Sequence, residues 1–111
     1  MQLLSPITVA SRTAPNRVMF GPHVTNLGAD DRSIPARQVA YYERRARGGC
    51  GTIVVEGASV HASDWPYERA PLAERCGPGW ADIVAACRPH GSLVIASLDH
   101  AGGQGSSAYS Q

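Results

Sequence analysis

Three short, mainly apolar runs constrain the fold of this chain more than any other feature. They lie at residues 18–20, 51–55 and 93–98, and the middle run, Gly-Thr-Ile-Val-Val, has no regular alternation with polar residues. A strand with one wet face alternates apolar and polar residues, whereas a parallel strand covered on both faces is apolar throughout. The runs therefore predict three strands of a parallel sheet.

The residues between the first two runs have helical periodicity. Apolar side chains recur at Val39, Tyr42 and Ala46, Ser33 is placed to cap the start, and a Gly-Gly pair at 48–49 ends the pattern. Cations are favourable near the end of a helix, so the arginines of this segment are expected to form a solvated face. They are Arg37, Arg44, Arg45 and Arg47.

A second helix is predicted after an irregular segment at 58–79, from an apolar stripe that ends before Pro89 and Gly91. The order strand, helix, strand, helix, strand builds a parallel sheet through right-handed crossovers. Doubly wound sheets and (β/α)8 barrels share this order, but the turn GPHVTNLG lacks the glycine pattern of a dinucleotide-binding fold. A loose alternation over residues 4–17 adds a short N-terminal hairpin. The stripe consists of Trp80, Ile83, Val84 and Cys87.

Composition excludes several classes of protein. The 111 residues suffice for one domain and not for two, and a formal net charge of +1 with interspersed signs is not typical of a nucleic-acid or membrane-surface binder. The three cysteines form no disulfide or zinc pattern, and we expect a cytoplasmic protein with reduced thiols, because no signal peptide or membrane-length apolar run is visible. A small molecule or another protein is the expected partner.

Chemistry in parallel α/β folds collects at the carboxyl ends of the strands. Here these ends are residues 21–25, 56–61 and 97–100, and each contains glycine or polar side chains. The histidines and acids at or near them leave open a metal-dependent hydrolase, although the first strand lacks the His-x-His with which barrel hydrolases generally begin, so no metal site is expected. These residues are His23, His61, His100, Glu56, Asp64 and Asp99.

Three motifs, NRVMFGPHVTN, YYERRARGGCGTIVVEGASV and LVIASLDHAGGQ, are similar in order and spacing to one family. From Pro6 to about Gln104 the chain resembles the opening third of the Old Yellow Enzyme-like NADH:flavin oxidoreductases. The resemblance is to the branch of 2,4-dienoyl-CoA reductase and trimethylamine dehydrogenase, and especially to members associated with mycofactocin gene clusters. It implies a TIM barrel that holds FMN at its mouth and passes hydride from NAD(P)H to an unsaturated acceptor, or oxidises an amine. A 4Fe-4S cluster and FAD would belong only to a longer parent.

The resemblance also implies which residues face the flavin and the substrate. Gly57 would let backbone approach the flat ring where a Cβ would obstruct it. Val24 stands where relatives commonly have Thr or Cys, Ser97 where they have Gln, and Gly103 where many have Arg. The implied cofactor-binding residues are Pro22, His23, Val24, Gly57 and Ser97, and the substrate-side candidates are His100 and Tyr67.

Purely structural roles remain open for several of these residues. His100 is as readily explained as a locally bonded loop histidine, and Trp65 with Tyr67 as an aromatic pair that pins a long loop. Glu56 ends an apolar strand, so its carboxylate must be paired or solvated, and we expect it to pair with a basic residue under the loops.

The length predicts about three of the eight barrel strands. Residues 1–111 are then the N-terminal fragment of one FMN-binding TIM-barrel domain, with a Gly/Ser-rich loop tail at 102–111, and no catalytic residue is expected in it. Such a fragment is expected to be inactive alone and to need the missing strands or to self-associate through its open sheet edge. The alternative is a non-catalytic interaction module that docks on a complementary chain. The candidates for the uncovered sheet face, which the sequence alone does not assign on strands that are apolar on both sides, are Val18, Phe20, Ile53, Val55, Val94 and Ala96.

Overall fold

Three parallel strands form the centre of the structure, a computed structural model that describes residues 2–109. Strand β4 (Thr52–Val54) lies between β3 (Met19–Phe20) and β6 (Leu93–Ile95) and pairs with both in parallel. The molecule is elongated, 50 Å long and 26 by 21 Å across. The parallel sheet predicted from the apolar runs is confirmed.

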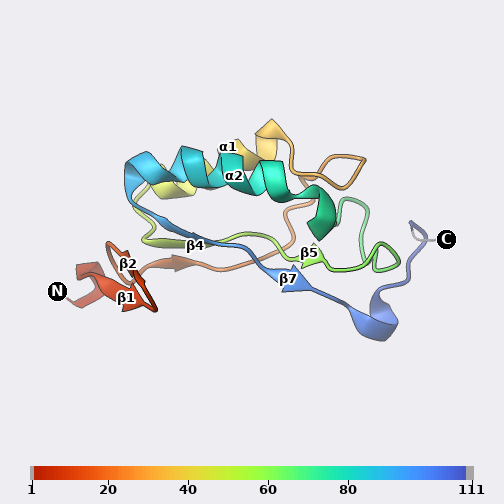
Figure 1. The fold of residues 1–111 in the computed structure, drawn as a ribbon, viewed down its shortest axis with the longest axis horizontal. Helices are drawn as coiled ribbons and strands as arrows, with labels where there is room; N and C mark the ends of the chain where they lie inside the picture. Colours follow the sequence, from red (N-terminus) through yellow and green to blue (C-terminus); the bar gives the residue numbers. More distant parts are fainter. Residues whose placement is uncertain (1, 110–111) are drawn as a thin grey trace.

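Both helices, α1 (Ala36–Arg47) and α2 (Gly77–Cys87), lie on the same side of this sheet (Figure 1). Helix α1 follows Pro35 and ends at Gly48, as the glycine pair predicts. The capping role predicted for Ser33 is wrong, because its hydroxyl donates to the Asp31 carboxylate at 2.6 Å and Pro35 occupies the N-cap position. Doubly wound sheets carry helices on both faces, so one-sided coverage favours a barrel.

Helix α2 ends through a tight turn, η3 (Arg88–His90), and Gly91 follows with φ of +79°. This left-handed conformation favours glycine, which explains why the apolar stripe stops there. The other short 3-10 turns are η1 (Gln2–Leu4), η2 (Ala73–Arg75) and η4 (Gly102–Gln104).

The segments outside the central sheet are short. The predicted N-terminal hairpin is present as β1 (Ile7–Val9) antiparallel to β2 (Arg12–Ala14). The third apolar run breaks after Ile95, and its remainder, β7 (Leu98–Asp99), pairs in parallel with β5 (Ala58–Ser59). The strand expected at 93–98 is therefore two strands. The sequence did not reveal β5.

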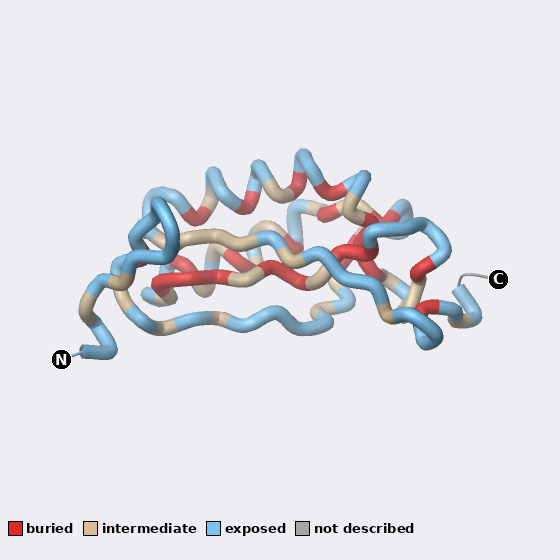
Figure 2. Tube along the Cα trace, turned by 60° about the horizontal axis from the view of Figure 1, so that its bottom comes forward, coloured by how far each residue is buried: buried red, intermediate tan, exposed pale blue. Residues whose placement is uncertain are grey.

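The hydrophobic core lies between the sheet and the helices (Figure 2). Ile53 and Val55 of the central strand are fully buried there, and Phe20 and Val94 pack against the same core. The prediction that these four residues face away from the helices is wrong. Val18 is half-buried and Ala96, which follows the end of β6, is exposed, so the structure does not place these two in the core.

The opposite sheet face is formed by the alternate residues of the same strands. Met19 is 61% exposed there, and Val54, Leu93 and Ile95 are half-buried. An apolar run has no polar residue to mark its solvent-facing side. The odd-numbered and the even-numbered residues of each strand are therefore equally good candidates for the buried face. Only the packing of the helices decides between them.

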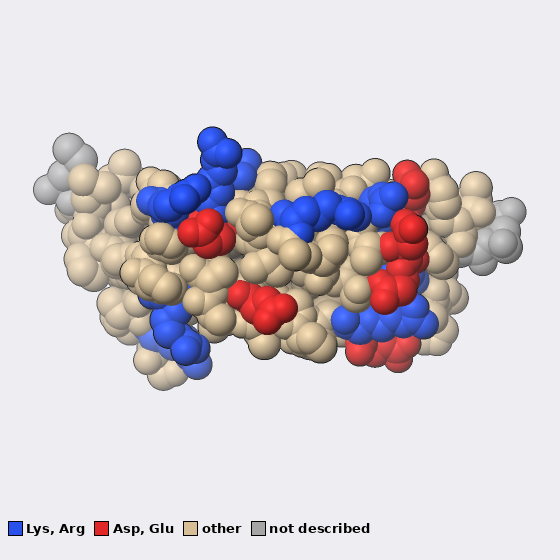
Figure 3. All heavy atoms as spheres, turned by 90° about the horizontal axis from the view of Figure 1, so that it is seen from above, with Lys and Arg blue, Asp and Glu red and all other residues tan. Residues whose placement is uncertain are grey.

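The arginine face of α1 is only partly solvated. Arg37 donates to the carbonyls of Leu27 and Gly28, both at 2.7 Å, and Arg45 stacks 3.7 Å from the centre of the Tyr41 ring. The prediction of a solvated face is therefore wrong for Arg45, which is half-buried, whereas Arg37 remains exposed as predicted. Figure 3 shows both signs of charge interspersed over the helix-covered side.

No helix within residues 2–109 combines the length and the apolarity needed to cross a membrane.

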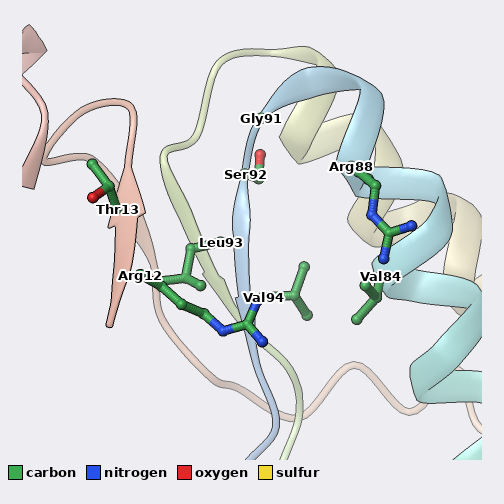
Figure 4. Close-up of a pocket in the computed structure, with 8 residues that line it drawn as sticks. All are labelled: Arg12, Thr13, Val84, Arg88, Gly91, Ser92, Leu93 and Val94. Atoms are coloured by element: carbon green, nitrogen blue, oxygen red, sulfur yellow. The ribbon is translucent and has the colours of Figure 1, made fainter. Parts of the chain in front are cut away.

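Strand β6 pairs with β4 on one side only. Leu93 N donates to Gly51 O at 2.8 Å and Ile95 O accepts from Val55 N at 2.9 Å, so the backbone groups of Val94, which alternate with these, point away from β4. A groove of about 570 Å³ runs beside this free edge (Figure 4). Arg12 and Arg88 line it from opposite sides.

We predict that the isolated chain self-associates through this edge, because unpaired strand groups template pairing with another chain. The change Val94→Pro removes the free N–H and spares the bonds to β4, so it should shift the chain toward monomer in sedimentation velocity. Val84→Ala, which removes an exposed apolar side chain at the same groove, is the control and should leave association unchanged. A wild-type chain that stays monomeric at all concentrations contradicts the prediction.

Candidate functional site

A second groove, of about 280 Å³, opens at the carboxyl ends of the parallel strands. The segments that follow β3, β4 and β6 meet there, as parallel topology requires. All five predicted cofactor-binding residues line it, together with Tyr67, whereas His100 does not. The lining residues are Pro22, His23, Val24, Glu56, Gly57, Tyr67, Ser97, Leu98 and Asp99.

The carboxylate of Glu56, 2% exposed, forms the buried base of this groove. Its Oε1 accepts a hydrogen bond from the Thr25 backbone N–H at 2.8 Å and another from the Thr25 hydroxyl. Its Oε2 accepts from the Tyr67 hydroxyl at 2.5 Å. The Gln38 amide lies at 3.5 Å from Oε1.

The predicted pairing of Glu56 with a basic residue is wrong. The two ion pairs within residues 2–109 join Arg69 to Asp30 and His90 to Glu43. Burying a carboxylate is costly unless hydrogen bonds replace its water. Around Glu56 neutral donors perform this role.

Burial and the Glu56 carboxylate together raise the pKa of two tyrosines. Desolvation is the main cause for both, and it raises the pKa of Tyr42, whose hydroxyl accepts from Glu56 N at 2.8 Å, to about 12. The pKa of Tyr67 rises further, because its hydroxyl also bonds to the carboxylate and its anion would be repelled by that charge. Both phenols therefore remain protonated at physiological pH.

Gly57 is constrained by strand β7. A Cβ added at Gly57 would lie 3.1 Å from both Cβ and Oδ2 of Asp99, closer than most Cβ contacts, so Asp99 would have to shift slightly. The absence of a side chain is thus explained within the protein by the approach of Asp99. The predicted approach of a flat ring to Gly57 stays a prediction.

His23 and the apolar residues form the outer wall. The His23 ring nitrogen Nε2 lies 2.8 Å from the Tyr41 hydroxyl, and its ring meets Phe20 edge-on at 5.3 Å. Val24 and Leu98 are 57% and 64% exposed. Helix α1 thus positions His23, and two apolar side chains remain available to a ligand.

The other candidate histidines are held locally. His100 Nδ1 accepts from Gly102 N at 2.9 Å, and His61 Nδ1 lies 2.7 Å from the Ser63 hydroxyl. Within the described residues, no three His, Cys, Asp or Glu side chains are grouped to hold a metal ion.

Sequence reasoning missed Arg32, which organises the long loop over the site. Its backbone has φ of +68°, its side chain is buried, and it donates to the carbonyls of Ala62, Asp64 and Ala70 at 2.7–3.1 Å. Its guanidinium lies 4.6 Å from the centre of the Trp65 ring. Trp65 therefore pins the loop. An arginine in a polar segment gives no signal for this.

Helices on one side of a parallel sheet, with a groove at the carboxyl ends of its strands, define the class as part of a (β/α)8 barrel. Comparison with known proteins gives the family. A sequence profile of the NADH:flavin oxidoreductase / NADH oxidase family matches residues 2–111, and the chain belongs to this family.

Individual relatives agree with this assignment. The NADH oxidase of Thermoanaerobacter brockii is 30% identical over 95 residues, which cover 80% of this chain and 14% of that protein. The N,N-dimethylglycine/sarcosine dehydrogenase of Chromohalobacter salexigens is 29% identical over 104 residues, 90% of this chain and 15% of that protein. The old yellow enzyme from Trypanosoma cruzi superposes with a TM-score of 0.79 at 27% identity, over 90% of this chain and 27% of that one. The chain thus spans a minor part of each relative.

The lining residues have the chemistry that a flavin ring requires, and no arginine for its phosphate is among them. Exposed Val24 and Leu98 provide apolar contact, and the Ser97 hydroxyl and nearby backbone provide polar groups. No arginine lines this groove, and the carboxylate of Asp99 stands at its exposed side, where a phosphate dianion would be repelled.

We predict that Glu56→Gln lowers the pKa of Tyr67, because it removes the negative charge and the carboxylate bond that oppose ionisation. Burial remains, so the pKa should stay above the ordinary value of about 10. NMR titration of tyrosine labelled at Cζ measures this, with Tyr67→Phe to assign the signal and Glu43→Gln as the control. A Tyr67 that titrates near pH 10 in the unmodified chain contradicts the placement.

Proposed function

We propose that residues 1–111 are the N-terminal part of an FMN-dependent oxidoreductase domain that passes hydride from NAD(P)H to an organic acceptor. The observation that carries the proposal is the convergence of Pro22, His23, Val24, Gly57 and Ser97 on one groove at the carboxyl ends of the strands. These positions were assigned to the flavin from motifs far apart in the sequence. Membership of the NADH:flavin oxidoreductase family supports the same reaction class.

The residues of this chain bind and orient the ring. Val24 and Leu98 offer apolar contact, the Ser97 hydroxyl offers a hydrogen bond to a polar edge, and the buried base keeps water from the inner side. FMN, when bound, accepts hydride from a nicotinamide and delivers it to a second substrate. The proposal gives the groove residues no role in holding the phosphate or in acting on the substrate.

The substrate is an unsaturated compound or an amine. The relative from Chromohalobacter salexigens, named for dehydrogenation of N,N-dimethylglycine and sarcosine, supports the amine. A 4Fe-4S cluster and FAD would belong to a longer parent. The three cysteines are free, in keeping with a cytoplasmic location.

The tail at 102–111 is proposed as an active-site loop of the same domain. Within its described part, Gly105 accepts from Trp65 N at 2.8 Å and Ser107 donates to the Trp65 carbonyl. These bonds attach the tail to the loop that contributes Tyr67 to the groove.

A second candidate function, docking on a complementary chain, is favoured by one observation. The backbone edge of β6 is free on the side away from β4, and the two arginines beside it, Arg12 and Arg88, make no ion pair within residues 2–109. A strand from the remainder of the barrel, or from another copy, fits this edge.

A chimera tests the proposed function. In the old yellow enzyme from Trypanosoma cruzi, the matching N-terminal segment is replaced by this chain, and the purified protein should carry flavin absorbance and oxidise NADPH. Gly57→Val should release the flavin, because the added side chain displaces Asp99 and reshapes the groove. Gly77→Val, at an exposed position outside the groove with open space around it, is the control. A folded chimera without flavin contradicts the proposal.

The isolated chain should bind FMN weakly, with a dissociation constant above about 1 µM, because only part of the ring site is present. Riboflavin, which lacks the phosphate, should bind at least as well, since no cation of the groove awaits the phosphate. Titration of both compounds by fluorescence quenching measures the ratio. Submicromolar FMN binding, or a clear preference for FMN, would show that this site has been misread.

A further inference from the structure

One buried carboxylate joins the separate segments that border the groove. Glu56 follows β4, Thr25 lies after β3, and Tyr67 lies in the long loop between β5 and α2. The sequence separations from Glu56 are 31 and 11 residues. No backbone bond between Thr25 and Tyr67 replaces this link in the described chain.

The geometry around Glu56 is that of a charged acceptor. Both oxygens are used, and the donors are the Thr25 backbone, the Thr25 hydroxyl and the Tyr67 hydroxyl. Hydrogen bonds to an ionised group are about twice as strong as neutral ones. The carboxylate therefore holds its partners more firmly than a neutral side chain would.

Gln38 approaches the same carboxylate from helix α1. Its side chain is fully buried on α1, its Nε2 is directed at Glu56, and its Oε1 has no hydrogen-bond partner within residues 2–109. Turning the amide over would place its oxygen against the carboxylate. A buried acceptor thus stays unpaired while the Gln38 donor group is directed toward Glu56 and Tyr42.

We infer that Glu56 is a positioning residue that holds Tyr67 as a wall of the groove and keeps the Tyr67 hydroxyl from the ligand. The Tyr67 proton is directed at Oε2, so Tyr67 contacts a ligand through its ring and does not act as a proton donor. This function for Glu56 extends the proposed function, since the ligand is taken to be the flavin or its substrate. The positioning itself is a property of this chain alone.

In this arrangement Asp99 is the carboxylate of the groove that remains available to a ligand. Of the two carboxylates that line the groove, Glu56 is saturated by donors, while Asp99 has an exposed side chain on the mouth side. Polar contact with a ligand therefore falls to Asp99, Ser97 and the backbone, and shape is set by Tyr67.

Hydrogen exchange on the dilute 111-residue chain tests the inference without any flavin. The reporter is the Ala70 N–H, which donates to the Tyr67 carbonyl at 3.2 Å, and the reference is the Leu93 N–H, which donates to Gly51 O at the far end of the sheet. Tyr67→Phe should speed exchange at Ala70 about tenfold, as expected for loss of a bond to a charged group, and leave Leu93 unchanged.

A double-mutant cycle separates positioning from general stabilisation. If Glu56 acts on the loop through Tyr67, Glu56→Gln and Tyr67→Phe together should speed Ala70 exchange no more than the larger single change. Effects that multiply would overturn the inference, as would an unchanged rate in Tyr67→Phe. If Glu56→Gln does not fold, the variants Thr25→Val and Tyr67→Phe are compared instead. Thr25→Val removes the hydroxyl bond from Thr25 to Glu56. An Ala70 exchange rate that fails to rise in either variant overturns the inference.

The matched control is Tyr109→Phe, at an exposed tyrosine outside the groove, which should change neither amide. Because no flavin is present, failure here would reject the role of Glu56 and leave the proposed function standing. A chimera without flavin, with the exchange results as expected, would do the reverse.

Discussion

The burial of the Glu56 carboxylate is the constraint on which the site depends. An apolar strand ends in a charge that has lost its water, and donors must come from elsewhere in the chain. They come from Thr25 after the first strand, from Tyr67 in a long loop and from Gln38 on a helix. The cost of leaving this charge unsolvated therefore helps to keep three segments together, in addition to the bonds of Arg37 and Arg69 to the segment after β3. The groove is the space left between them.

A second group of hydrogen bonds, centred on Arg32, holds the long loop between β5 and α2. The buried Arg32 guanidinium is bonded to three carbonyls of the segment that carries Trp65, and the buried Asp64 accepts from Ala101 N at 3.1 Å beyond β7. Burial lowers the pKa of Arg32, with the nearby Asp64 charge opposing this effect. The buried Arg32 and the buried Asp64 thus each hold a loop through hydrogen bonds to neutral backbone groups. The loops over the groove are fixed by polar bonds, and the layer beneath is fixed by apolar packing.

That layer is asymmetric. Both helices cover one sheet face (Figure 1). The opposite face exposes Met19 and leaves Val54 half-buried. In a complete barrel such a face is the interior, closed by strands from the other side. This explains how one sheet can be well packed on one face and open on the other.

The sequence by itself determined the order and type of the main elements, the strand ends that form the groove, and the family. Consecutive apolar residues, helical spacing and terminal glycines act over a few residues, so a local pattern contains them. Tertiary structure alone decided which face of each strand is buried, why Gly57 has no side chain, and which donors Glu56 uses. Thr25 and Tyr67 lie 42 positions apart and meet only through Glu56, and no local pattern marks a partner supplied by the folding of distant segments.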